Sequence, residues 1–374
     1  MKNITDSKIT TNNNTELTVI VDPGKNSVKV TVYDNEYNLQ KKFSFPSKTM
    51  RKRNFADIDT SNENQYKVIL NNEKYLVGDG VVNNYNFDIT KNNFHHKLCI
   101  YTAIANSINK NGTQVRLVVG YPSSDYRNEE QLKEYRNLLT PKNGFVSMIL
   151  NEEVKSFEIK EINVLPEGIA LKPRMANPKK ATQIIDLGGQ NLNYRNYDVN
   201  GNTLKAFSLD HAGINHLEEY LKKELRTFIR ADIIDVDAID FLEVIKNTDI
   251  DGVKDEYVTN YNSTKEFANE TILTFIENNI IGPLNTKGIN LYQKGHFIIF
   301  TGGGSLLLEP YLRELLPNNE GNMYFSPTCR WDNCISYAIK DLGDRYKNNS
   351  LLNTKSIKEL ILKYGTKILD FRDK

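Results

Sequence analysis

Apolar residues along this chain follow two different spacings, and the two alternate. Short apolar runs that end in turn residues are typical of buried strands, whereas apolar positions three and four apart mark amphipathic helices. Strand-like runs occur at 19–35, 66–80, 115–122 and 183–199. Helical spacing occurs at 95–110, 126–139, 211–230 and 264–280. These spacings predict a chain that combines strands with helices.

Two of the strand-like segments, 19–35 and 183–199, also resemble each other. Aligned, they match Asp22 with Asp186 and Gly24 with Gly188. Each segment begins with an apolar run that ends in the Asp, turns on a glycine-containing loop, and resumes as an alternating strand. Glycines in such a turn let the backbone approach a ligand and point its N–H groups at an anion. The repetition predicts two like domains that face each other across a phosphate group.

A third glycine segment lies in the last third of the chain. Residues 296–315 read as an apolar strand, then Gly302, Gly303 and Gly304, then Ser305 and an amphipathic helix. Because three glycines remove every side chain from the turn, a flat group such as a purine can lie against bare backbone.

Composition narrows the class of protein. A chain of 374 residues favours two domains over one. The net charge of +1 gives no overall basic field toward nucleic acid or anionic lipid. Cys99, Cys329 and Cys334 lack metal-ligand spacing and favour reduced thiols. With no signal peptide in the polar first sixteen residues and no apolar run of membrane-spanning length, we expect a cytoplasmic protein.

Three motifs connect these glycine loops with a known family. They are Asp22-x-Gly24-x-x-Ser27-x-Lys29, Asp186-Leu187-Gly188-Gly189, and the Leu165-Pro166-Glu167 that precedes the second loop. Their order, with the glycine turn in the last third, resembles the actin superfamily over roughly residues 17–345. In detail the motifs resemble the bacterial plasmid-segregation actins of the ParM type. The resemblance implies an α/β, actin-like ATPase fold, in which two related domains, each with a mixed sheet flanked by helices, enclose a nucleotide cleft.

The resemblance also divides the chain. It implies a disordered N-terminal segment at 1–16, a first domain at 17–170 and a second domain at 171–345. A polar, turn-rich stretch suggests a peripheral insertion at about 46–95, and a smaller insertion is expected at about 231–262. Residues 346–374 are expected to form a C-terminal helical extension, in which 356–371 has amphipathic spacing.

In the family, the two loops bind the β- and γ-phosphates of ATP or GTP, and Mg²⁺ is held through water. By resemblance, Asp22 and Asp186 hold Mg²⁺ through its water ligands, while Glu167 and Asp186 are the catalytic residues. Glu167 would orient the attacking water, because positioning and electrostatics dominate phosphoryl transfer. The expected nucleotide-binding residues are Asp22, Gly24, Lys25, Asn26, Ser27, Lys29, Gly188, Gly189, Gln190, Asn191, Gly302, Gly303, Gly304 and Ser305.

The resemblance implies a filament-forming protein that hydrolyses ATP or GTP and drives plasmid segregation. Its partners would be further copies of itself and an adaptor protein that binds a centromere-like DNA site, with no direct contact to nucleic acid or membrane. Gln190 and Asn191 depart from the smaller residues common in the family, which bears on the hydrolysis rate more than on nucleotide binding.

Two other functions share this cleft. A sugar or acetate kinase would need a catalytic Asp beside a small hydroxylated substrate, and 120–170 offers no clear candidate. A membrane-associated cell-shape or division actin would need an amphipathic anchor, for which 356–371 is the only candidate.

Overall fold

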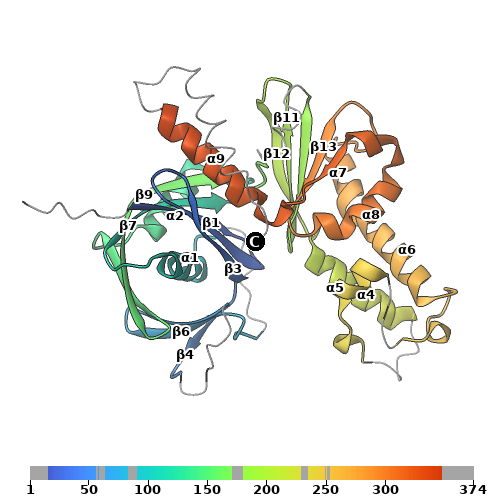
Figure 1. Ribbon diagram of the computed structural model, residues 1–374. Helices are drawn as coiled ribbons and strands as arrows, with labels where there is room; N and C mark the ends of the chain where they lie inside the picture. The colour runs from blue at the N-terminus through green and yellow to red at the C-terminus, as the bar shows by residue number, and fades with distance from the viewer. Residues whose placement is uncertain are drawn as a thin grey trace, which may run out of the picture.

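Two β-sheets, each covered by helices, make up the described part of the chain (Figure 1). The computed structural model describes residues 16–55, 58, 64–82, 91–170, 180–228, 235–248, 250 and 253–347. The predicted N-terminal segment lies outside the described residues except for Glu16, and so does the predicted helix at 356–371. No helix in these described ranges is long and apolar enough to cross a membrane.

The first sheet has nine strands in the order β3-β2-β1-β7-β9-β8-β5-β6-β4. Its centre, β1, β7 and β9, is parallel, and the flanking strands are antiparallel, so the sheet is mixed. The strands are β1 (Glu16–Pro23), β2 (Ser27–Tyr33), β3 (Leu39–Pro46), β4 (Thr49–Lys52), β5 (Gln65–Leu70), β6 (Glu73–Gly78), β7 (Thr113–Tyr121), β8 (Phe145–Leu150) and β9 (Glu153–Pro166).

The stretch at 46–95, which was predicted to be a peripheral insertion, contributes strands at one edge of this sheet. Strands β4, β5 and β6 come from it and extend the main sheet, because β5 pairs with β8 through Val68 and Ile69. The pairing is driven by the alternation in β5, where Tyr66, Val68 and Leu70 are buried on one face.

Helices cover both faces of the first sheet. Val19 and Val21 of β1 pack on the side of α1 (Phe94–Ser107) and α2 (Glu129–Leu139), whereas Ile20 packs on the opposite side. That opposite side is covered by α9 (Asp332–Lys347), which runs across the first sheet in Figure 1. The sequence division placed 332–345 in the second domain, but by packing this segment belongs to the first.

A buried carboxylate fixes α9 in place. Asp341 is fully buried and accepts hydrogen bonds from Arg116 (2.8 Å from Nη2), Tyr37 (2.6 Å) and Asn163 (2.7 Å). Burial alone would raise the pKa of Asp341, but these hydrogen bonds and the charge of Arg116 outweigh it and lower the pKa. The carboxylate is therefore charged and fully paired where α9 meets β7.

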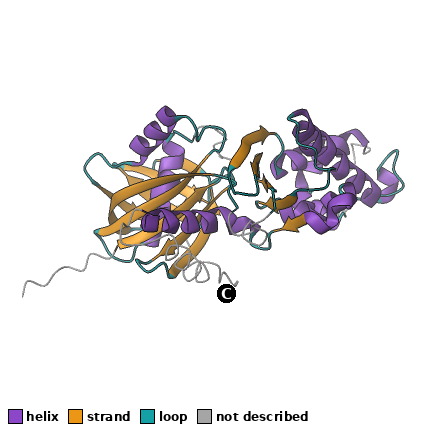
Figure 2. Cartoon of the chain, turned by 90° about the horizontal axis from the view of Figure 1, so that it is seen from above, coloured by secondary structure: helices purple, strands orange, loops and turns teal. Residues whose placement is uncertain are grey.

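The second sheet has five strands in the order β12-β11-β10-β13-β14, with β10, β13 and β14 parallel. Its helices gather on the side away from the first domain (Figure 2). The strands are β10 (Thr182–Leu187), β11 (Asn191–Tyr197), β12 (Thr203–Asp210), β13 (Phe297–Thr301) and β14 (Met323–Phe325). The α-helices are α4 (Ile214–Phe228), α5 (Phe241–Asn247), α6 (Thr264–Ile276), α7 (Gly282–Thr286) and α8 (Ser305–Leu315), and a π-helical turn, Glu277–Ile281, joins α6 to α7.

The two sheets share one internal plan. In both, the first strand is antiparallel to the second and parallel to a later strand, β7 or β13. The register agrees as well, since Asp22 pairs with Lys29 and Asp186 pairs with Asn193. The internal repeat predicted from the sequence is therefore confirmed strand by strand, and the expected α/β fold with it.

Candidate functional site

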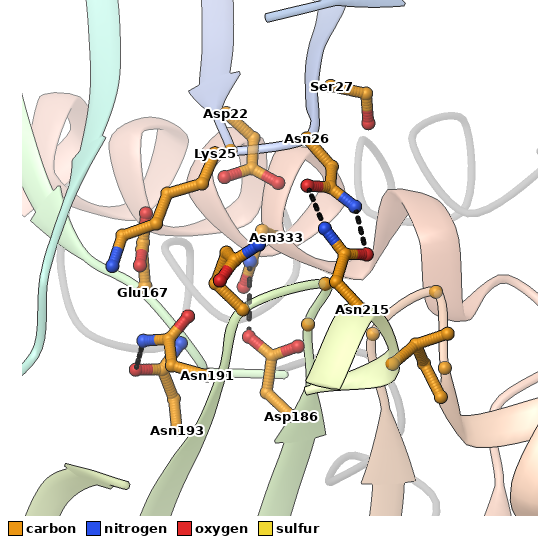
Figure 3. Close-up of a pocket in the computed structure, with 18 of the residues that line it drawn as sticks. Asp22, Lys25, Asn26, Ser27, Glu167, Asp186, Asn191, Asn193, Asn215 and Asn333 are labelled. Atoms are coloured by element: carbon orange, nitrogen blue, oxygen red, sulfur yellow. Dashed lines mark hydrogen bonds between the residues drawn. The ribbon is translucent and has the colours of Figure 1, made fainter. Parts of the chain in front are cut away.

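A cleft of about 520 Å³ lies where the turns of the two sheets meet (Figure 3). Its volume is within the range of small-molecule sites. The structure brings fifteen of the sixteen predicted site residues to its walls, and the exception is Ser305. The Ser305 hydroxyl donates to the carbonyl of Gly302 at 2.9 Å, so this side chain closes the glycine turn.

Three carboxylates meet in the cleft. Asp22 and Asp186 lie at the ends of β1 and β10, and Figure 3 shows them pointing toward each other. Glu167 directly follows β9, so it belongs to the same domain as Asp22. The side chains of all three carboxylates are buried. Burial, and then the charges of Asp22 and Glu167, raise the pKa of Asp186 to about 7. The cleft thus concentrates negative charge that a cation would neutralise.

One lysine, Lys29, is paired with a member of this carboxylate group. Lys29 donates to Oδ2 of Asp22 at 3.2 Å. Burial would lower the pKa of Lys29, but the neighbouring negative charge, first that of Asp22, outweighs it and raises the pKa. Lys29 is therefore a fixed positive charge beside Asp22.

The carboxylates fit an outer-sphere Mg²⁺ site. Mg²⁺ keeps several waters and typically takes one or two carboxylates together with substrate phosphate oxygens. Among the described residues there is no group of three or more His, Cys, Asp or Glu side chains that could hold a metal ion by themselves. The facing pair Asp22 and Asp186 fits this donor set, and the raised pKa of Asp186 shows that its charged form lacks a compensating partner in this buried position.

The glycine-containing loops that follow Asp22 and Asp186 contact each other. The side-chain amides of Asn26 and Asn215 donate to one another at 2.7 and 2.9 Å, as Figure 3 shows. A Cβ at Gly189 would lie 2.2 Å from the side-chain nitrogen of Asn26, so a side chain there would displace this amide from its present position. Asn26 belongs to the first loop and Asn215 to α4, so the pair joins the two domains.

Glu167 has a partner that the sequence did not suggest. The ammonium of Lys91, a residue just before α1, donates to Oε1 of Glu167, and both side chains line the cleft. Asn333, in the first turn of α9, was missed as well. It accepts from the N–H of Gly168 at 3.1 Å and donates to Oδ2 of Asp186 at 3.4 Å.

The glycine turn is shaped by its neighbours. Gly302 has a left-handed backbone, φ +82°, and a Cβ there would lie 2.5 Å from the carbonyl oxygen of Leu187. Gly304 donates its N–H to that same carbonyl at 3.0 Å. Gly303 faces open space, since nothing lies within 4 Å of the position of its Cβ. The bare backbone predicted from the three glycines is therefore present in the cleft wall.

Comparisons with known proteins agree with this architecture. Residues 21–169 match the family model described as the actin-like proteins N-terminal domain. No curated protein sequence matches the chain significantly.

Solved structures match nearly the whole chain at low sequence identity. The Alp12 filament structure is 22% identical, with a TM-score of 0.61, and the alignment covers 89% of this chain and 99% of that one. An archaeal actin homologue is 16% identical, with a TM-score of 0.66 and coverages of 88% and 99%. A ParM from a 15-stranded Clostridium botulinum filament is 18% identical, with a TM-score of 0.60 and coverages of 87% and 98%. The described part of the chain therefore has the actin-like fold that the sequence resemblance implied, and the structures that share this fold include the Alp12 and ParM filament proteins.

Proposed function

We propose that this protein binds ATP or GTP in the cleft, polymerises in the nucleotide-bound state and hydrolyses the nucleotide within the filament. The observation that carries the proposal is the pair of like loops, each beginning at an Asp, that face each other beside a bare glycine turn. Two backbone loops directed at one space suit a chain of phosphates, and the glycine turn suits a flat base.

The loops and the lysine bind the phosphates. Backbone N–H groups of the first loop, Gly24 to Ser27, and of the second, Gly188 to Asn191, would donate to phosphate oxygens from opposite sides. Lys29 keeps a positive charge at the first loop because Asp22 holds it there. Asp22 and Asp186 would hold Mg²⁺ through water, and the ion supplies positive charge beside the phosphates when bound.

Glu167 is the proposed water-orienting residue. Its main chain is fixed, because its N–H donates to Tyr121 at 3.0 Å and its carbonyl accepts from the Ser123 hydroxyl at 2.5 Å. The side chain points from this anchored position into the cleft (Figure 3). A carboxylate held in this way can accept a hydrogen bond from water and align it for attack on a terminal phosphate.

We further propose that the filament moves plasmid DNA in the cytoplasm through a DNA-binding adaptor. Two of the structural relatives, Alp12 and the Clostridium botulinum ParM, form filaments. The net charge of +1 supports delegation of DNA binding to a partner.

The test is light scattering of the purified protein with Mg²⁺ and ATP, GTP, ADP or no nucleotide, followed by electron microscopy and a phosphate-release assay. ATP- or GTP-dependent filaments with phosphate release that follows assembly are the expected result. Nucleotide turnover only in the presence of a sugar or acetate, without filaments, would refute the proposal in favour of a kinase.

A further inference from the structure

Lys91 occupies an unusual place in the cleft. Its side chain is 2% exposed, and its ammonium donates to Oε1 of a Glu167 side chain that is 10% exposed. Its backbone is left-handed, with φ +54°, which is uncommon for a residue other than glycine. Strained backbone of this kind persists where surrounding structure holds it, and it clusters at functional sites.

Stability alone does not explain such a pair. Removing two charges from water costs as much as their attraction returns, and apolar residues of similar volume often serve the fold equally well. The main chain of Glu167 is already fixed through Tyr121 and Ser123. What Lys91 adds is the direction of the carboxylate.

Without Lys91, the Glu167 carboxylate would lose the hydrogen-bond donor that holds Oε1. Asp22 and Asp186 lie in the same cleft, and Lys29 is paired with Asp22. Lys91 holds Oε1, whereas within the described part of the chain Oε2 of Glu167 accepts no hydrogen bond. One oxygen is therefore anchored, and the other can accept a hydrogen bond from water.

We propose that Lys91 is a positioning residue for nucleotide hydrolysis, acting by fixing the Glu167 carboxylate toward the attacking water. The inference rests on the proposed ATPase function and adds to it a residue distant in sequence from all three glycine motifs. It requires that Lys91 affect turnover through Glu167 and leave nucleotide binding nearly unchanged.

The first test is Lys91→Met, which keeps most of the side-chain volume and removes the donor and the charge. We expect kcat for ATP hydrolysis with Mg²⁺ to fall about 10- to 100-fold, as when an orienting partner of an active group is lost. The Kd for ATP should stay within about threefold, because the phosphate-binding loops are intact. Lys97→Met is the matched control, since Lys97 lies on α1 outside the cleft, and it should keep the parental kcat.

The second test is a double-mutant cycle with Glu167→Gln. If Lys91 acts through Glu167, Lys91→Met should change the residual kcat of the Glu167→Gln protein by less than about threefold. Because the double variant carries no buried charge at this pair, it also provides the test if Lys91→Met alone does not fold. Lys91→Gln, which keeps a hydrogen-bond donor, should have a kcat between those of Lys91→Met and the parent protein.

The outcomes separate the inference from the proposed function. A parent protein that neither binds nor hydrolyses ATP or GTP would refute both. A parental kcat in Lys91→Met, additive effects in the cycle, or a lost affinity for ATP in a folded Lys91→Met protein would refute only the role assigned to Lys91. Thermal melting and circular dichroism of every variant establish that it is folded.

Discussion

Gly302→Ala should lower the stability of the fold, whereas Gly303→Ala should lower the affinity for nucleotide. In Gly302→Ala the side chain would sit in a left-handed backbone at φ +82°, which costs about 1–2 kcal/mol for an L-residue. It would also lie 2.5 Å from the carbonyl oxygen of Leu187, a backbone atom that cannot rotate away. Overpacking of this kind costs about 1–3 kcal/mol. We expect the free energy of unfolding to fall by about 2–5 kcal/mol.

Gly303→Ala is the matched partner. Nothing lies within 4 Å of the added Cβ, and the backbone is outside the left-handed region. The free energy of unfolding should therefore stay the same or rise by about 0.4–1 kcal/mol, because Ala restricts the unfolded chain. Gly303 lines the cleft, however, and a methyl group would hold a purine away from the backbone. Affinity for nucleotide should fall about 10- to 200-fold, the range for one misplaced methyl-sized group in a pocket.

Urea denaturation without nucleotide and titration with a fluorescent ATP analogue measure the two quantities separately. The steric argument is refuted if Gly302→Ala is as stable as the parent. The placement of the base on the glycine turn is refuted if Gly303→Ala binds nucleotide with the parental Kd. A shared loss of stability in both variants would mean that the turn is generally fragile and that the difference between the two glycines has no consequence.

Three further predictions follow from the cleft and its supports. Asp186→Asn should lower ATP hydrolysis about 10²- to 10³-fold in a phosphate-release assay, and a parental rate would remove Asp186 from the mechanism. The melting temperature of the nucleotide-free protein should stay level or rise, because the raised pKa of Asp186 shows that its charged form is disfavoured in the folded protein. Asn215→Ala removes two hydrogen bonds between the domains, each worth about 0.5–1.5 kcal/mol. Stopped-flow release of nucleotide should therefore accelerate about 5- to 150-fold, and an unchanged rate would mean that the pair does not hold the cleft closed. Since the folded pKa of Asp341 is below its ordinary value, its contribution to stability is complete above about pH 4 and is lost as the pH falls further. Asp341→Asn should therefore flatten the fall in urea-denaturation stability below about pH 4, and equal slopes in parent and variant would contradict this account.

The fold was predictable where the signal is local. The Asp at the end of an apolar run, the glycine turn and the alternating return strand all lie within about seventeen residues, so two copies could be matched directly. The matched Asp22 and Asp186 occupy the same register in the two sheets. Helices with clear apolar spacing were placed within a few residues of their observed ends.

Prediction failed where partners lie far apart in the chain. The sequence marks Lys91 only as a lysine before a helix, and its pairing with Glu167 spans 76 positions. Asn215 meets Asn26 across 189 positions. In the stretch at 46–95, polar residues concealed β4, because an edge strand with one neighbour needs little apolar alternation.

The position of α9 shows why such distant contacts matter for the chemistry. At its first turn Asn333 connects the N–H of Gly168, next to Glu167, with the carboxylate of Asp186, so one side chain contacts both halves of the site. Two turns later Asp341 anchors the same helix to β7 through Arg116. Strand β7 ends at Tyr121, whose carbonyl accepts the N–H of Glu167. Helix α9 is therefore linked to the main chain around Glu167 at both places, through Asn333 and through Asp341. Because α9 packs on the first sheet and Asp186 lies on β10 of the second, a motion between the domains would change the contact between Asn333 and Asp186.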